Sequence, residues 1–407
     1  MKSGSHFLLA ARQCEIAELE ELARTGELVG AIGRFIHALQ RERGISGVFL
    51  GSQGQRFGEQ RLQQVGACER AEQDVLAQLD RLDTDSSHAR NGSRLFGRVA
   101  VVLHGLAGLP PLRERIAALA LPAREATAAF TRLIAGLLAV VFEAADTATD
   151  PQVSRALVAL FNFMQGKEFA GQERAFGARA FAAGAIDAAA QQEWEHLIES
   201  QQACLAIFAE FAGAEVLQAD RASQEPAVLA QVERLRRIAC TARDGRLDTE
   251  LSHAWYEQCT LRIDAMKAVE DRLATHLRAL CEQRIAQARA DLRDQRVLLD
   301  SLAAQANAGE PAPGGRYGPH LERSVLELVQ EQSRRLQAMS DELDEVRTSL
   351  NERKVIERAK GLLMAHRHMS EDDAYKALRQ MAMNQNRRLV DVANSVLSLA
   401  EMLPGGR

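Results

Sequence analysis

Aromatic residues and prolines are scarce in this sequence. Only 5% of its 407 residues are aromatic and 9 are prolines, whereas 46% are hydrophobic, chiefly alanine and leucine. Sheets favour aromatic and β-branched residues, so this composition argues against a mainly β protein and predicts an all-α fold. The length predicts about two or three domains of ordinary size.

Long apolar runs are also missing. The longest, residues 133–142, lies between Arg132 and Glu143, and it is far shorter than the roughly 20 residues of a membrane-spanning helix. The N-terminal stretch has a short apolar segment but soon becomes acidic and amphipathic, with no convincing cleavage site. We therefore predict a cytoplasmic protein with no membrane partner.

The usual motifs of catalysis and cofactor binding are absent from the sequence. It contains no GxGxxG, no GK[ST] loop, no HExxH and no nucleophile elbow, and its 10 histidines are dispersed. The 6 cysteines are scattered without a CxxC pair, which is typical of reduced cysteines in a core. We predict that the protein is not an enzyme and has no catalytic residue, metal or cofactor.

Positive charge is concentrated near the C-terminus. Residues 353–388 contain nine lysines and arginines against four acidic residues, whereas the whole chain has a net charge of -5. A basic segment on an acidic body is typical of a nucleic-acid-binding module, although a solvated charged helix has the same pattern.

Proline and glycine divide the chain. They cluster in residues 303–319, where we predict a linker. Before it, long helical patterns predict a bundle of helical hairpins over residues 1–302. These patterns are interrupted at residues 109–111, near Pro122, at 150–151, near Gly184 and at 224–226.

A heptad pattern follows the linker and predicts a coiled coil over residues 320–352. The spacing alternates between three and four, with Gln332 at its one polar position. A narrow seam of this kind favours a two-stranded coiled coil and a homodimer, although a helix that packs on its own domain gives the same pattern. The apolar seam residues are Val325, Val329, Leu336, Met339, Leu343, Val346 and Leu350.

Residues 353–407 predict a small module of three helices. Its core is expected from Ile356, Leu363, Ala374, Leu378, Met381, Leu389, Val392 and Val396. Six basic side chains then remain outside for phosphate groups: Arg353, Arg358, Lys360, Arg379, Arg387 and Arg388. Ala359 and Gly361 allow either a close approach of nucleic acid or tight helix packing, and Tyr375 either stacks on an unpaired base or joins the core.

This module resembles the ANTAR domain, the RNA-binding output of bacterial transcription antitermination regulators. The resemblance covers RKVIERAKGLLMAHRHMSEDDAYKALRQMAMNQNRRLVDVANSVL, in which apolar, glycine and basic positions all match in order. It implies that the target is paired hairpins in a leader RNA and that binding prevents a terminator from forming.

Three arginines of the first 302 residues lie where apolar residues are expected. Arg43 continues the stripe of Leu28, Ile32, Phe35 and Leu39, Arg236 shares a face with Leu229, Val232 and Ala239, and Arg174 lies among small residues. A buried guanidinium group needs an anion. Either a buried carboxylate, such as Glu42 or Glu173, or a bound planar oxyanion would supply it.

Four segments of this region resemble successive landmarks of the NIT domain, an all-α nitrate- and nitrite-sensing domain. They are LQRERGISGVFLGS, KEFAGQERAFGARAF, VERLRRIA and SHAWYEQCTLRIDAMKAVED. The resemblance implies that Arg43 and Arg236, with Arg174 as a third residue, bind nitrate or nitrite. The two ER motifs at Arg43 and Arg174 are also consistent with a duplicated half-bundle, although the similarity is short.

Together, the two resemblances imply a ligand-responsive antitermination regulator of nitrate assimilation. Nitrate or nitrite in the N-terminal domain would free the C-terminal domain to bind leader RNA. The alternative is a helical regulator that binds DNA or protein and senses another small anion.

Overall fold

The described part of the chain consists of helices joined by short connections. The structure, a computed structural model, describes residues 4–82, 92–242, 244–308, 319–367, 369, 371–385 and 387–402. All regular elements in these ranges are α-helices, which confirms the predicted all-α fold. They are α1 (Gly4–Gly51), α2 (Gly58–Leu79), α3 (Gly92–Ala107), α4 (Leu109–Ala117), α5 (Ala123–Thr147), α6 (Pro151–Ala183), α7 (Ala188–Phe211), α8 (Ala214–Ser223), α9 (Pro226–Cys240), α10 (Leu251–Ala308), α11 (Pro319–Arg367), α12 (Glu371–Gln385) and α13 (Leu389–Met402).

The helix ends of the N-terminal region lie at the predicted breaks. Before α6, the side chain of Asp150 accepts hydrogen bonds from the first free amides at 3.0 Å, and Pro151 takes a position where no amide donor is needed. Gly184 ends α6 with φ of 67°, a conformation that glycine adopts without strain. Prolines also mark the first turns of α4 and α9, and Pro122 precedes α5.

The predicted linker is wrong at its start, because α10 continues to Ala308. Residues 303–308 are rich in alanine and contain no proline, and the first proline of the segment is Pro311. Alanine and glutamine favour helix, so the sequence itself supports the longer helix. Residues 309–318 lie outside the described residues.

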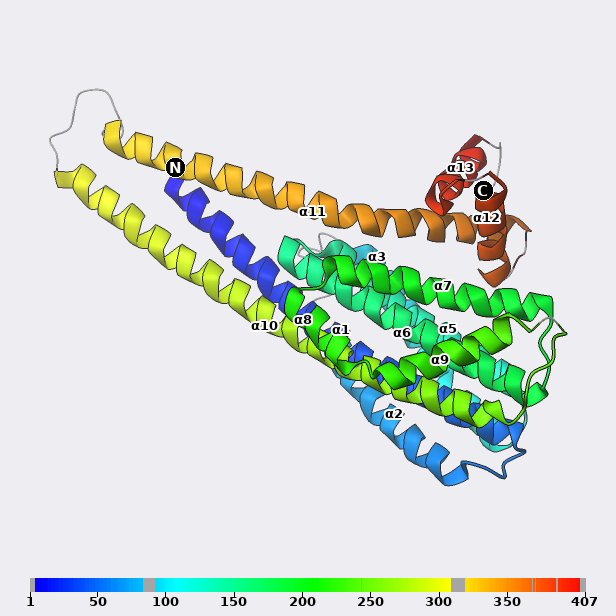
Figure 1. Cartoon of the computed structure of the whole chain (residues 1–407). Helices are drawn as coiled ribbons and strands as arrows, with labels where there is room; N and C mark the ends of the chain where they lie inside the picture. The colour runs from blue at the N-terminus through cyan, green and yellow to red at the C-terminus, as the bar shows by residue number, and fades with distance from the viewer. Residues whose placement is uncertain are drawn as a thin grey trace. The chain divides into compact units, whose positions relative to one another are not determined.

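Two compact units make up the chain, Met1–Gln332 and Ser333–Arg407. In the first unit, α1 and α10 run side by side, and α6 and α7 form a second adjacent pair (Figure 1). The apolar stripe of α1 faces the inside of this bundle, because Leu28, Ile32, Phe35 and Leu39 are at most 1% exposed. Regular spacing of these residues on one face explains why so long a helix is stable.

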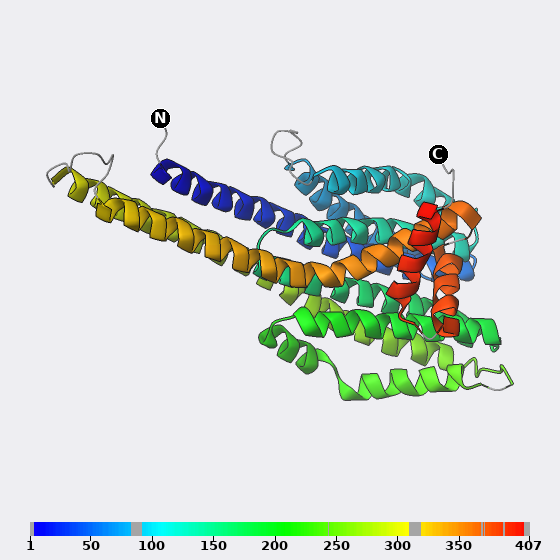
Figure 2. The ribbon, with the colours of Figure 1, turned by 90° about the horizontal axis from the view of Figure 1, so that it is seen from above.

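The second unit has a small core of its own. Figures 1 and 2 show α12 and α13 lying across the C-terminal end of α11. All eight predicted core residues, from Ile356 to Val396, belong to the cluster that these three helices enclose. The predicted three-helix module is therefore confirmed in its helices and in its core.

Two segments of the described ranges are long and apolar enough to cross a membrane by length and composition alone, Ser93–Ala117 and Ala123–Thr147. The second is α5, and 56% of its apolar window is buried inside the unit. Contacts with α1, α3 and α6 account for this burial, and a core helix passes the same test as a spanning one.

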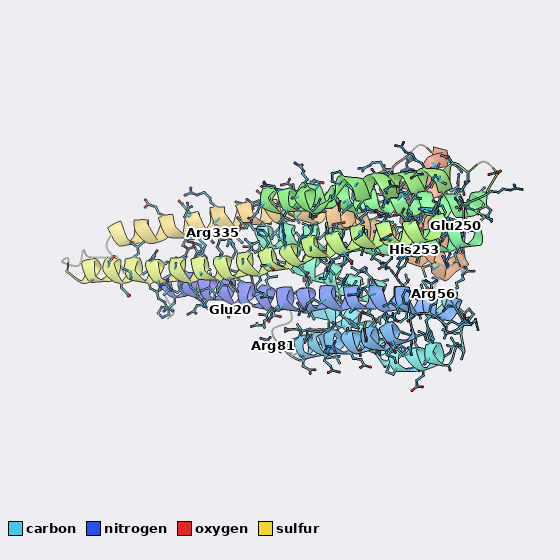
Figure 3. The ribbon with its side chains drawn as sticks, turned by 60° about the horizontal axis from the view of Figure 1, so that its bottom comes forward. Glu20, Arg56, Arg81, Glu250, His253 and Arg335 are labelled. Carbon is cyan, nitrogen blue, oxygen red and sulfur yellow. The ribbon has the colours of Figure 1, made fainter. Side chains whose placement is uncertain are left out.

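Charged side chains cover the outside of the first unit. Figure 3 labels Glu20 on α1 and Arg81 just after α2 among these surface side chains. Glu20 accepts a hydrogen bond from Arg289 of α10 at 2.7 Å, and Arg81 donates to Glu27 at 3.1 Å. Exposed pairs of this kind stabilise a fold by about 1 kcal/mol or less each, so they contrast with the buried pairs described next.

Candidate functional site

Arg43 lies inside the bundle, as its place in an apolar stripe predicts. Its side chain is 2% exposed and donates to Glu168 of α6, with Nη1 2.5 Å from Oε1 and Nη2 3.2 Å from Oε2. Nη1 also donates to the hydroxyl of Thr131 at 3.0 Å. Gln40 and Gln172 donate to the same carboxylate at 2.8 and 2.9 Å. The charge of Arg43 is therefore balanced by a protein carboxylate.

Arg236 is paired in the same way on α9. Its Nε and Nη2 lie 2.7 Å from the two oxygens of Glu173, which also accepts from Trp194 at 3.0 Å and Gln201 at 2.6 Å. Burial raises the pKa of Glu173, but the hydrogen bonds and charge of Arg236 outweigh this effect and hold it below its usual value. Glu173 was one of the two carboxylates that the sequence suggested as a partner.

Arg174 is the exception among the inward arginines. It is 7% exposed, its Nη1 donates to the hydroxyl of Thr260 at 3.0 Å, and its guanidinium group lies 5.0 Å from the ring centre of Tyr256. Among the described residues, no carboxylate forms an ion pair with it. Both contacts are with neutral groups, so they do not balance the charge of Arg174.

The structure brings Arg43 and Arg174 to the contact between α1 and α6. A Cβ atom on Gly44 would lie 3.4 Å from Nη2 of Arg174, and one on Gly171 would lie 3.0 Å from Nη2 of Arg43. Arg236 contacts a different side of α6. Its partner Glu173 is five residues from Glu168, which places the two carboxylates about 140° apart around the helix.

Glu42 is not the partner of Arg43, contrary to one of the two options that the sequence suggested. Neighbouring residues of a helix point about 100° apart, so the two side chains face different helices. Glu42 instead accepts from Nε and Nη2 of Arg113 on α4, both at 2.9 Å. The sequence carried a signal for Arg113, because Leu109, Arg113 and Ile116 share a helix face and all three are buried.

A second group of charges was missed by sequence reasoning. Lys167 of α6 is fully buried and its amine lies 2.5 Å from the carboxylate of Glu270 on α10. Nδ1 of His37 on α1 is buried without a hydrogen-bond partner. Burial, and then the charges of Lys167, Lys267, Arg41 and Arg174, lower the pKa of His37 to about 3. His37 is therefore a neutral group in cationic surroundings.

The described residues also bear on metal binding. Within the described ranges, no group of three or more histidine, cysteine, aspartate or glutamate side chains lies close enough together to hold a metal ion. The inward arginines are hydrogen-bond donors in a planar fork, and such groups bind anions.

The predicted basic face of the second unit is only partly exposed. Arg358, Arg387 and Arg388 are exposed, whereas Arg379 is half-buried. Lys360 is 8% exposed, its amine is held by Glu357 at 2.9 and 3.1 Å, and it lies 6.0 Å from the ring centre of Tyr375. The side chain of Arg353 lies outside the part of the chain that the structure describes.

The small residues of α11 have different environments. Ala359 is fully buried in the core of the second unit, so its size serves helix packing. A Cβ atom on Gly361 would meet nothing within 4 Å, so packing does not require a glycine there. The open space leaves Gly361 accessible to a ligand.

The chain joins a helical unit with buried arginines to a small helical unit with exposed arginines. Two family models match these parts and define a regulatory protein with a sensor and an output. Residues 34–278 match the family described as nitrate and nitrite sensing (NIT), and residues 344–397 match the ANTAR domain. Both are regulatory families.

Two proteins are similar to this chain over nearly its whole length. The nitrate regulatory protein of Klebsiella oxytoca is 34% identical over 395 residues, which cover 96% of this chain and 93% of that protein. The solved structure of the NasR transcription antiterminator matches with a TM-score of 0.60 and 31% identity, over 98% of this chain and 99% of that one. The chain belongs to the family of NasR-type antitermination regulators, which respond to a ligand through a NIT domain.

Proposed function

We propose that nitrate or nitrite binds among the inward arginines of residues 1–302, and that binding frees residues 353–407 to bind leader RNA hairpins and prevent termination. The observation that carries the sensor half is the pair Arg43 and Arg174, two buried guanidinium groups at the contact of α1 and α6. With Arg236, they are the residues that the NIT resemblance implies as ligands.

Guanidinium groups suit this ligand because their N–H donors lie in one plane. Nitrate and nitrite offer a planar O–N–O fork of the same shape as a carboxylate, and an arginine that binds a carboxylate in two places can bind either anion similarly. The carboxylates of Glu168 and Glu173 already bind the guanidinium groups of Arg43 and Arg236. A ligand at these two arginines therefore competes with protein carboxylates, and such competition can shift helices.

The output half of the proposal rests on charge. Residues 353–388 hold nine basic residues on a chain with a net charge of -5, so the acidic body attracts the basic module in the absence of ligand. We assign RNA contacts to Arg353, Arg358, Lys360, Gly361, Arg379, Arg387 and Arg388, with Tyr375 as a stacking group and Ala359 as the small residue beneath them.

The same proposal covers assembly and location. The seam of α11 joins two chains into a homodimer, which supports two output modules for paired hairpins. Leu336 is 58% exposed in the single chain, as expected for a seam residue that packs on a partner helix, whereas Leu343, Val346 and Leu350 of the same seam are at most 8% exposed. We place the protein in the cytoplasm, where its leader RNA is transcribed.

Calorimetry on the full chain tests the sensor half. Nitrate and nitrite should bind, whereas sulfate and chloride at equal concentration should not. Arg43→Ala should weaken binding, and an affinity equal to that of the wild type would remove Arg43 from the site. Absence of nitrate and nitrite binding by the wild type would refute the proposed function.

Gel shifts test the output half against its alternative. A leader RNA with two hairpins should bind better than duplex DNA of matched length, and better with nitrate than without it. A clear preference for duplex DNA would instead establish a DNA-binding regulator. The unit Ser333–Arg407 alone should bind RNA without nitrate. The acidic first unit is then absent and cannot cover the basic surface of the second unit.

A further inference from the structure

The second unit has a cleft between α11 and α13. The cleft has a volume of about 230 Å³, and a hollow of about 390 Å³ continues from it along α13. Asp391 and Asn394 line both. Six of the eight residues that line the cleft have polar side chains, so a ligand there would be held mainly by hydrogen bonds.

Two asparagines line this cleft from different helices, Asn351 from α11 and Asn394 from α13. Both side chains are exposed, and within the described ranges neither amide has a hydrogen-bond partner. Each amide presents an N–H donor beside a carbonyl acceptor. The edges of nucleobases present the same pair of groups, and asparagine binds them with two hydrogen bonds. Proteins read unpaired RNA bases through such contacts.

The arginines next to this cleft are available to phosphate groups. Arg387 lines the hollow, and it donates to neutral oxygens only among the described residues, at 3.3 and 3.4 Å. Arg388 lines the cleft and lies 3.4 Å from a carboxylate oxygen of Glu352 and 3.5 Å from one of Asp391. Both arginines are exposed, and exposed pairs of this length are weak, so a phosphate group can replace them.

The cleft itself suits a base better than a phosphate group. Its lining includes the carboxylates of Glu352 and Asp391, which repel a phosphate group. The same carboxylates accept hydrogen bonds from the amino groups of bases. The charges therefore favour a nucleotide whose base enters the cleft and whose phosphate groups stay at the arginines.

The exposed arginine of α11 lies on the same side of the helix as the cleft. Arg358 is seven residues from Asn351, so the two side chains point within about 20° of each other around the helix. Lys360 is nine residues from Asn351 and points about 180° away from it. Lys360 lies over the ring of Tyr375, so these two residues belong to the opposite side of α11.

We propose that an unpaired base of the leader RNA binds in the cleft between α11 and α13, where Asn351 and Asn394 read its edge. Arg387 and Arg388 hold the phosphate groups on either side of this base. The inference rests on the proposed function and names a base-binding site within it, on the side of α11 opposite Tyr375. It makes the two asparagines the residues that determine specificity for the base.

Filter binding of the full chain to a two-hairpin leader RNA, with nitrate and over a range of KCl concentrations, tests the site. Asn351→Ala and Asn394→Ala should each weaken binding about 5- to 150-fold, the range for one pair of hydrogen bonds to a base. The slope of log K against log salt should not change, because no charge is lost. Asn384→Ala is the matched control, since Asn384 is exposed in the same unit and lines neither hollow.

A set of leader RNAs, each with one unpaired loop base changed, gives the second readout. For the wild type, one of these changes should cost as much as Asn394→Ala does. The same RNA should then bind Asn394→Ala no more weakly than the unchanged RNA does, because the contact is already lost. This coupling distinguishes a base contact from a general loss of structure.

Wild-type affinity in both asparagine variants would overturn the inference, as would a loss that is equal for every loop sequence. A loss of affinity in Tyr375→Leu together with wild-type affinity in both asparagine variants would place the base on the opposite side of α11. A wild-type protein that prefers duplex DNA to the leader RNA would overturn the proposed function instead.

Discussion

Arg236 and Glu173 form a bidentate ion pair inside the first unit, in which Nε and Nη2 of Arg236 each lie 2.7 Å from a carboxylate oxygen of Glu173. The two residues are 63 positions apart, so the pair joins α9 to α6. Trp194 and Gln201 of α7 donate to the same carboxylate. One buried group thus connects three helices, and loss of Glu173 leaves Arg236 with only the half-exposed Glu233 as a carboxylate partner.

Removal of Glu173 should destabilise the protein strongly. Glu173→Ala removes the buried carboxylate of Arg236 and the acceptor of Trp194 and Gln201, which costs about 3 to 5 kcal/mol for a buried pair. Urea unfolding followed by circular dichroism measures this loss. Glu233→Ala is the control, because Glu233 also pairs with Arg236 but is 54% exposed, and it should cost about 1 kcal/mol or less. Equal losses in both variants would contradict a buried, fully compensated pair.

Acid should destabilise the first unit through His37. Burial, then Lys167, Lys267, Arg41 and Arg174, lower its pKa from 6.5 to about 3. Below pH 6.5 the unfolded chain binds a proton that the folded chain does not bind until about pH 3, so stability falls with pH across this window.

The same imidazole can be removed to isolate its contribution. His37→Gln should lose about 3 kcal/mol less than the wild type between pH 7 and pH 4. Unfolding in urea at the two pH values gives this difference directly. An unchanged pH dependence in His37→Gln would show that carboxylates such as Glu173, whose pKa lies below its usual value, account for all of the acid sensitivity.

Local features of the sequence predicted most of the fold. Proline, glycine and aspartate act on their own turn of the chain, so the sequence alone predicted the helix ends at Asp150 and Gly184. The spacing of apolar residues likewise predicted that Arg43 and Arg236 point inward. The sequence did not predict all ion-pair partners of these arginines. Glu168 is 125 residues from Arg43, and the pairing of the two residues depends on how α1 and α6 pack.

The exposed arginines of the second unit should control RNA affinity through phosphate contacts. Arg358→Ala should weaken RNA binding and lower the slope of log K against log salt by about 0.7, the value for one contact with single-stranded nucleic acid. Filter binding over a range of KCl concentrations measures both effects. Arg56→Ala removes the same charge from the first unit, where Figure 3 labels Arg56. It should leave the slope unchanged, and an equal effect in both variants would point to net charge instead of a contact.

The seam of α11 should govern dimerisation. Leu336 and Val329, in the first part of the seam, are 58% and 40% exposed in the single chain, whereas Leu343, Val346 and Leu350 are at most 8% exposed. Leucine and valine at heptad positions favour burial against a partner helix, so we expect the first part of the seam to make the dimer contact. Leu336→Asp would place two carboxylates in the seam of a dimer, so it should shift the mass measured by sedimentation equilibrium from twice that of the chain toward a single chain. Ala338→Asp adds the same charge at an exposed position outside the seam, and it should leave the mass unchanged. A wild-type protein that sediments as one chain at every concentration would contradict the coiled coil, and its apolar residues would then have to pack on their own chain.

Loss of the dimer should also weaken RNA binding, because two modules on one dimer suit a target of two hairpins. The loss of effective concentration should lower the affinity for the two-hairpin RNA by roughly 100-fold or more, while binding of each module to a single hairpin is retained.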